Sequence, residues 1–288
     1  GVGHVYEYGG PAIEALDMEG RLAVCNMSIE GGARAGYINP DETTYEYLKG
    51  REYVPEGEAF EERKAYWESV ASDDDAEYDD VVTVDADGLD PLVTWGINPG
   101  QVIEISEPVP HPDDFEARTD REAAEQALDH MEIEAGQSML GYDVDVAFLG
   151  TCTNGRLSDF EEAAKILEGN TVDEDVRALA VPGSETVRQQ CEERGIDEVF
   201  INAGFQWRRA GCSMCLAMND DALEGDEVCA SSSNRNFIGR QGSKDGRTVL
   251  MSPAMVAAAA VEGEVADARE YLDDGPTGGA GGVEEVAD

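Results

Sequence analysis

Apolar runs separated by amphipathic stretches predict alternating strands and helices in the second half of the chain. Residues 144–149 form a nearly continuous apolar run, as in a strand that is buried on both faces. After a loop, Ser158 and Glu161 form a capping box that predicts the start of a helix. Residues 178–181 predict a second strand, and Ser184 is expected to cap a second helix. Strands and helices that alternate at this spacing favour a parallel sheet.

Shorter apolar runs predict the remaining elements. Residues 199–201 are expected to form a third strand of the same sheet. Residues 248–251 predict a further strand, and the alanine-rich stretch 253–268 predicts the helix that follows it. Nearer the N-terminus, residues 81–84 and 92–95 are candidate strands.

Cysteines follow two of the predicted strands. Cys152 lies in the loop after the first strand, and Cys212 and Cys215 lie after the third. Ligands of open α/β sheets bind beyond the carboxyl ends of the strands. We therefore expect these three thiols to meet at one edge of the sheet, although 60 residues separate Cys152 from Cys212.

Three cysteines without an obvious fourth ligand leave several chemistries open. Zinc sites close with four ligands, and the histidines are remote in sequence. They are His4, His111 and His130. A thioredoxin-like pair needs no distant third cysteine. The spacing favours a [4Fe–4S] cluster with one iron not bound by cysteine, which can act as a Lewis acid. A zinc site and unliganded thiols stay open as alternatives. Cys25, Cys191 and Cys229 are not expected to be ligands, and Cys191 is predicted to lie on a buried helix face.

The composition excludes several classes of partner. The 288 residues include 63 acidic and 20 basic side chains, which gives a net charge of −43. This charge disfavours binding to nucleic acid or to an anionic membrane surface. Because 41% of the residues are hydrophobic, the chain is expected to fold, with its acidic surface adapted to high salt. The chain contains no apolar N-terminal run typical of a signal peptide and no run of about 18 apolar residues that could span a membrane, and we expect a cytoplasmic location.

The negative charge is unevenly spread. Residues 201–250 contain six basic and six acidic side chains, and residues 199–219 contain no acid. Arg235 and Arg240 fall in this neutral region, and arginine binds carboxylates through two parallel hydrogen bonds. A small anionic substrate near the cysteines is one hypothesis. The alternative is that the arginines of residues 201–250 pair with the carboxylates of the chain itself.

Several segments together resemble the aconitase superfamily, and most closely the large subunits of 3-isopropylmalate dehydratases. The similarity extends from about residue 5 to residue 268, and it rests on segments 25–36, 40–45, 93–96, 148–156, 211–219 and 229–242. It implies one [4Fe–4S] cluster per subunit. The implied ligands are Cys152, Cys212 and Cys215, and the implied substrate-binding residues are Asn234, Arg235 and Arg240.

The resemblance also places Asn26 and Glu30 at the catalytic site. Their spacing of four residues would put both side chains on one face of a helix. Without the resemblance, a solvated helix face would be the simpler interpretation of this pair.

The implied reaction is the dehydration of 2-isopropylmalate and the rehydration of the resulting alkene to 3-isopropylmalate, a step of leucine biosynthesis. The implied partner is a small subunit, whose swivelling domain carries the catalytic serine, in a heterodimer. A homoaconitase- or aconitase-type hydratase acting on another 2-hydroxy acid is an alternative. A structural zinc domain is an alternative of a different class.

The resemblance implies an α/β fold of three-layer α/β/α domains with parallel sheets. Residues 1–100 would be the remainder of a second domain, 101–142 a connecting region and 143–268 a third domain with the cysteines, and 269–288 a flexible acidic tail. Family members carry a further N-terminal domain with active-site histidines that this sequence does not match. We therefore expect a C-terminal fragment that is inactive by itself, even with the small subunit.

Overall fold

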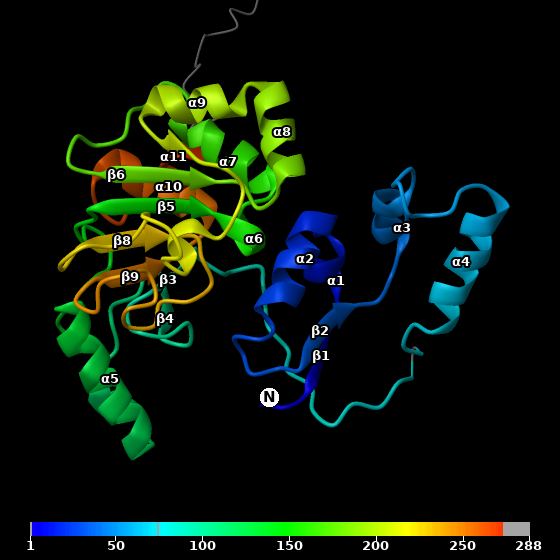
Figure 1. Cartoon of the computed structure of the whole chain (residues 1–288). Coiled ribbons are helices and arrows are strands. Elements are labelled where there is room, and N and C mark those ends of the chain that lie inside the picture. Colours follow the sequence, from blue (N-terminus) through cyan, green and yellow to red (C-terminus); the bar gives the residue numbers. More distant parts are fainter. Residues whose placement is uncertain (1, 74, 273–288) are drawn as a thin grey trace, which may run out of the picture. The chain divides into compact units, whose positions relative to one another are not determined.

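The computed structural model describes residues 2–73 and 75–272. The chain divides into two compact units, with the division between Leu89 and Asp90, and Figure 1 shows the elements of each. Among the described residues, no helix has the length and apolar character that crossing a membrane requires.

The first unit is built on a pair of parallel strands. β1 (Val5–Tyr8) pairs with β2 (Ala35–Ile38). The helices of this unit are α1 (Pro11–Glu14), α2 (Met18–Met27), α3 (Glu42–Leu48) and α4 (Glu58–Ser69). The buried Arg21 on α2 forms an ion pair with Asp41, the residue that caps α3, at 2.6 Å. This pair connects two helices of a unit that has a small apolar core.

The predicted strand over 81–84 is wrong. The segment has no regular secondary structure, and Val81, Val82 and Val84 are 67–81% exposed. β-branched residues favour strands because they fit a half-buried pleated surface, and acidic neighbours keep this segment in water.

The second unit contains a five-stranded parallel sheet in the order β7-β6-β5-β8-β9. The strands are β5 (Val146–Gly150), β6 (Arg177–Val181), β7 (Gln206–Trp207), β8 (Val228–Ser231) and β9 (Arg247–Leu250). The strands predicted at 144–149, 178–181 and 248–251 are confirmed, with small shifts of their ends. The α/β class with a parallel sheet is therefore confirmed as well.

The two faces of this sheet are covered differently. On one face, Ala147 and Leu149 of β5 belong to a large core that includes α7 (Leu157–Leu167) and α10 (Pro253–Glu262). On the other face, Val146 and Phe148 belong to a smaller cluster that includes Met214, Cys215 and Leu223. These last three residues come from the connection between β7 and β8, so this cluster is completed by the segment that carries two of the candidate ligands.

The segment expected to be a connecting region contributes to the core of the second unit. β3 (Leu92–Thr94), which confirms the strand predicted near 92–95, pairs antiparallel with β4 (Val102–Glu104). Ile105 and Met131, the last residue of α5 (Arg118–Met131), are buried in the same cluster as the sheet. A single-turn 3-10 helix, Pro112–Asp114, precedes α5.

The predicted third strand over 199–201 is wrong. These residues lie in α9 (Ile196–Ala203), and β7 follows at Gln206. The buried side chains of Ile196, Phe200 and Ala203 recur at helical spacing. A short apolar run of this kind does not by itself distinguish a strand from a buried helix.

Other helix ends differ from expectation in detail. The capping box at Ser158 is wrong, because α7 already begins at Leu157, and the backbone N–H of Arg156 donates to Asp159 Oδ2 at 2.9 Å. The cap at Ser184 is confirmed: its hydroxyl accepts from the N–H of Val187, at the start of α8 (Glu185–Arg194). The final predicted helix is shorter than expected, because α10 ends before Gly263, whose φ is +75°. A short helix, α11 (Arg269–Leu272), follows, and the expected tail beyond it lies outside the described residues.

Candidate functional site

The strand order changes direction between β5 and β8. From β5 the chain proceeds to β6 and β7 on one side, and β8 and β9 then extend the sheet on the other side. Ligands of doubly wound sheets bind at such a switch point, outside the carboxyl ends of the strands. Cys152 follows β5, and Asn234 and Arg235 follow β8, so candidate residues flank this position from both strands.

Cys152 lies on a single helical turn, α6 (Thr151–Asn154), beyond the tip of β5 (Figure 1). The turn requires glycine at Gly150, because a Cβ there would lie 1.9 Å from the carbonyl oxygen of Val181. Thr151 adopts a φ of +79°, which is costly for a β-branched residue. This backbone turn leaves Cys152 exposed.

A buried serine holds the turn from the neighbouring strand. Ser232, directly after β8, is fully buried. Its hydroxyl accepts from the N–H of Gly150 at 2.9 Å, and its carbonyl accepts from Asn154 Nδ2 at 2.8 Å. The start and the end of the Cys152 turn are therefore both fixed to the strand across the switch point.

The Cys212–Cys215 segment follows β7 and includes a short 3-10 helix, Ser213–Cys215. Met214 is fully buried, Cys215 is 6% exposed, and Cys212 is exposed. Ser213 has a φ of +44° and Ala217 a φ of +48°. Together with Thr151, these account for all but one of the non-glycine residues with positive φ among those that the structure describes. Such backbone strain is characteristic of functional sites.

The thiols of Cys152 and Cys212 each lie within electrostatic reach of the Cys215 thiol. Burial raises the pKa of the Cys215 thiol, contact with Arg240 opposes this shift, and negative charge on Cys152 and Cys212 adds to it. Arg240 also donates from Nε to the backbone carbonyl of Cys215 at 2.9 Å. Cys215 thus lies near both Cys152 and Cys212, and the predicted substrate-binding residue Arg240 contacts Cys215.

A carboxylate that the sequence did not single out organises the same segment. Asp221 accepts from Arg208 at 2.6 Å, from the Ser213 hydroxyl at 2.6 Å and from Asn219 Nδ2 at 3.0 Å. Burial would raise the pKa of Asp221, but these donors outweigh it and hold the pKa below its ordinary value. In the sequence, Asp221 was one acid among 63, so no signal distinguished it.

Comparison with known proteins identifies the family. Residues 1–263 match the model of the aconitase family, described as aconitate hydratase. The chain belongs to the aconitase family. Similar proteins are named 3-isopropylmalate dehydratase large subunit. One from Halorubrum lacusprofundi is 65% identical over 271 residues, and one from Haloarcula marismortui is 64% identical over 271 residues. One from Salinibacter ruber is 62% identical over 274 residues.

Each of these matches covers 94% of this chain but only 57–58% of the relative. The chain therefore spans little more than half the length of the curated relatives that it matches. The family shown by the comparisons is the one expected from the sequence segments.

The cysteine site fits the cluster that aconitase-family proteins generally use. Among the described residues, no three His, Cys, Asp or Glu side chains are arranged as ligands of a single metal ion. Thiolates that share one zinc ion lie about 3.8 Å apart, from Zn–S bonds of about 2.3 Å in tetrahedral geometry. Thiolates that bind different irons of a cluster are spaced more widely. Cys152 and Cys212 each act electrostatically on Cys215, and thiolates of cysteine are the ligands that iron–sulfur clusters take.

Asn234, Arg235 and Arg240 are half-buried after β8. Their segment is held by the buried Asn236, whose Nδ2 donates to the carbonyl of Gly96 at 2.6 Å. The structure thus places the predicted substrate-binding residues on a loop that is fixed next to the switch point.

Asn26 and Glu30 belong to the first unit, and their predicted position on one helical face is wrong. α2 ends at Met27, and Glu30 lies in the turn beyond it, where its N–H donates to the carbonyl of Met27. The four-residue spacing suggested a continuous helix, but the chain turns at Ser28. The catalytic role of the pair stays a prediction.

The other cysteines are placed differently. Cys191 on α8 and Cys229 on β8 are fully buried, and Cys25 on α2 is partly buried. Burial raises the pKa of the Cys229 thiol strongly, which disfavours the thiolate that metal binding needs. No disulfide joins cysteines of the described residues.

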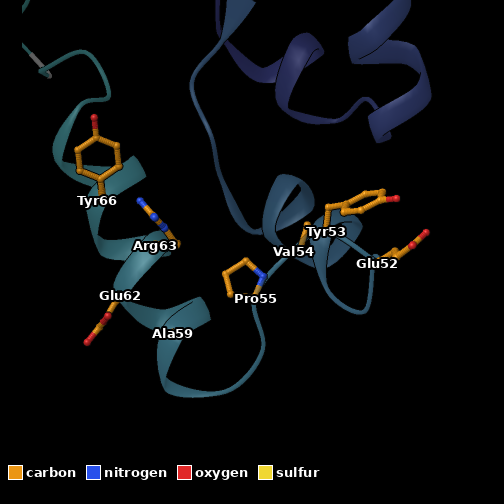
Figure 2. A pocket seen from close by; sticks show the side chains of 8 residues that line it. All are labelled: Glu52, Tyr53, Val54, Pro55, Ala59, Glu62, Arg63 and Tyr66. Atoms are coloured by element: carbon orange, nitrogen blue, oxygen red, sulfur yellow. The ribbon is translucent and has the colours of Figure 1, made fainter.

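A surface hollow in the first unit lies between the segment 52–55 and α4 (Figure 2). Glu62, Arg63 and Tyr66 line it from the helix. Its lining contains no cysteine and none of the predicted site residues, so it is not part of the candidate site.

Proposed function

We propose that the chain is the major part of a 3-isopropylmalate dehydratase large subunit, which interconverts 2-isopropylmalate and 3-isopropylmalate. The observation that carries this proposal is the convergence of Cys152, Cys212 and Cys215 at the carboxyl edge of one sheet, with Arg240 in contact with Cys215. The names of the relatives support the choice of substrate. The enzyme would be a hydro-lyase of leucine biosynthesis in the cytoplasm.

In this proposal the three thiolates hold a [4Fe–4S] cluster. When bound, the cluster supplies a Lewis acid at the iron that no cysteine binds. Arg235, Arg240 and Asn234 bind the carboxylates of the substrate, because arginine can pair with a carboxylate through two parallel hydrogen bonds. Loss of the substrate hydroxyl group as water requires side chains that bind this hydroxyl and transfer a proton to it. We assign these roles to Asn26 and Glu30.

The proposed partner is a separate small subunit, which supplies the catalytic serine on a swivelling domain and completes a heterodimer. The relatives are named large subunits, which supports a multisubunit enzyme. A homoaconitase- or aconitase-type reaction on another 2-hydroxy di- or tricarboxylate is the alternative substrate class. A panel of such acids, tested on enzyme assembled from the full-length large subunit and the small subunit, separates these substrates.

Metal analysis tests the cluster. The chain is reconstituted with ferrous iron and sulfide without oxygen, beside the variants Cys152→Ser and Cys191→Ser. We expect near-stoichiometric cluster in the native chain and in Cys191→Ser, and loss in Cys152→Ser. Stoichiometric zinc without iron would support the structural zinc alternative and overturn the cluster assignment.

Substrate binding is tested in the assembled enzyme with Arg240→Lys. The control is Arg247→Lys, because Arg247 pairs with Glu132 at 2.8 Å and is not assigned to substrate. A lysine keeps the charge but loses the paired hydrogen bonds. We expect at least a tenfold loss of kcat/KM in Arg240→Lys, equivalent to about 1.4 kcal/mol. Unchanged KM and kcat would contradict the role of Arg240 in substrate binding.

A further inference from the structure

The Cys212–Cys215 segment adopts a conformation that needs external support. Its backbone hydrogen bonds are local, from Cys215 N–H to the Cys212 carbonyl at 3.0 Å and from Ala217 N–H to the Met214 carbonyl at 3.1 Å. Ser213, between the two cysteines, has a φ of +44°. A non-glycine residue in this region costs about 1–3 kcal/mol and persists only where the surroundings fix it.

The side chain of Asp221 provides this support from a single point. Its Oδ1 accepts from Arg208 before the cysteine pair, at 2.6 Å. Its Oδ2 accepts from the hydroxyl of Ser213 inside the pair, at 2.6 Å, and from Asn219 after the pair, at 3.0 Å. One carboxylate therefore joins three parts of the same loop.

Arg208 connects this arrangement to the sheet. Its backbone N–H donates to the carbonyl of Ala180 in β6 at 2.9 Å, as a continuation of the β7 ladder. Asp221 itself is 7% exposed, and hydrogen bonds between ionised partners in such surroundings are stronger than neutral ones. The position of Ser213 is thus coupled through Asp221 to a residue that the sheet holds.

We propose that Asp221 is a positioning residue, which fixes the Cys212–Cys215 segment in the conformation that binds the cluster. The proposal rests on the cluster assignment of the preceding section. Asp221 does not ligate iron or contact substrate in this scheme. It determines where the Cys212 and Cys215 sulfurs lie relative to the sheet, and hence relative to Cys152.

The variant Asp221→Asn tests this, because it keeps the size of the side chain but removes the charge and one acceptor. The matched control is Asp267→Asn. Asp267 also pairs with an arginine, Arg269, at 2.6 Å, and the two carboxylate side chains are similarly buried, 13% exposed for Asp267 and 10% for Asp221. If Asp221→Asn does not fold, Ser213→Ala and Asn219→Ala each remove one of the three donors.

The first measurement uses the iron-free chain. Alkylation of each cysteine is followed by mass spectrometry, with buried Cys191 as the internal reference. We expect Cys215 to react at least about tenfold faster in Asp221→Asn than in the native chain, with Cys191 unchanged, because the loosened loop opens locally. The Asp267→Asn control should match the native chain. An unchanged ratio of Cys215 to Cys191 overturns the positioning role.

The second measurement uses the reconstituted chain. We expect Asp221→Asn to lose iron to a chelator several-fold faster than the native chain or Asp267→Asn, at a similar Tm. Equal retention overturns the inferred role in cluster binding. Failure of the native chain to retain iron and sulfide would instead refute the cluster itself, and the alkylation experiment would still decide whether Asp221 fixes the segment.

Discussion

Replacing Ser232 by alanine should destabilise the second unit through the Cys152 turn. The Ser232 hydroxyl accepts from the Gly150 N–H at 2.9 Å, and Ser232 is fully buried. Alanine removes one oxygen atom, so the dominant cost is a buried N–H left without an acceptor. That cost is about 1–3 kcal/mol. For a domain of about 150–250 residues, 1 kcal/mol corresponds to about 2–4 °C in Tm, so we expect a decrease of about 2–12 °C.

The assay must report on the second unit alone. Two of the three tryptophans, Trp95 and Trp207, lie in the second unit and the third, Trp67, lies in the first, so a Trp67→Phe background isolates the signal. Thermal unfolding is followed by fluorescence at about 1 M KCl, where the Debye length is about 3 Å and surface repulsion is screened.

The control for this experiment is Ser243→Ala. Its hydroxyl accepts from the N–H of Asp245 at 3.1 Å in an exposed turn, where water can replace it. We expect a change in the free energy of unfolding of less than about 0.5 kcal/mol. A Ser232→Ala variant with the same Tm as Ser243→Ala would refute the argument that Ser232 satisfies a buried donor.

The remaining predictions concern packing, pH and salt. Gly183→Ala should destabilise the second unit by about 1–3 kcal/mol in urea unfolding, because its Cβ would lie 2.7 Å from the carbonyl oxygen of Thr151. Gly211→Ala, which meets no atom within 4 Å, should be nearly neutral, and equal effects would contradict the steric reason. Hydrogen bonding to Arg21 lowers the pKa of Asp41 below its ordinary 3.8. This stabilisation of the first unit is therefore fully present above about pH 4 and is lost as the pH falls through the lowered pKa. In Asp41→Asn, the Tm should therefore depend less on pH below about pH 4 than in the native chain. An unchanged dependence would contradict a stabilising role of the Arg21–Asp41 ion pair. Finally, the net charge of −43 predicts a Tm that rises steeply with KCl up to about 1 M, whereas a flat salt profile would argue against screened repulsion.

The sequence predicted those parts of the fold in which local pattern and tertiary environment agree. β5, β6 and β9 are buried apolar runs in a parallel sheet, and their environment requires that pattern. The run at 199–201 was ambiguous because a buried helix also consists of apolar residues, and the buried positions 196, 200 and 203 decide for helix only when they are considered together. The segment 81–84 failed for a different reason. Its valines have high strand propensity, but they are exposed and pack against no other surface, so no strand forms.

The candidate site was predictable for a similar reason, and only in part. Residues that follow parallel strands lie at the same edge of the sheet, so the topology places Cys152 and the Cys212–Cys215 segment at one edge, although the strand before Cys212 is β7 and not the predicted 199–201. The supports of these loops carry no such signal. Ser232 and Asp221 are ordinary residues in the sequence, and their roles follow from contacts that span 82 and 13 residues of chain.

The contacts of the arginines in the neutral region, residues 201–250, show what several of these basic residues do. Two of its arginines do pair with carboxylates of the chain, Arg208 with Asp221 and Arg247 with Glu132, as the alternative interpretation expected. Arg240 differs, because its Nε donates to the carbonyl of Cys215 and its guanidinium contacts the thiol. The basic residues of this region therefore have at least two uses, in holding the cysteine loops and in lying beside the thiols. Among Arg208, Arg240 and Arg247, Arg240 alone contacts a thiol, so Arg→Lys variants should reduce stability at Arg208 and Arg247 and should affect the proposed catalysis at Arg240.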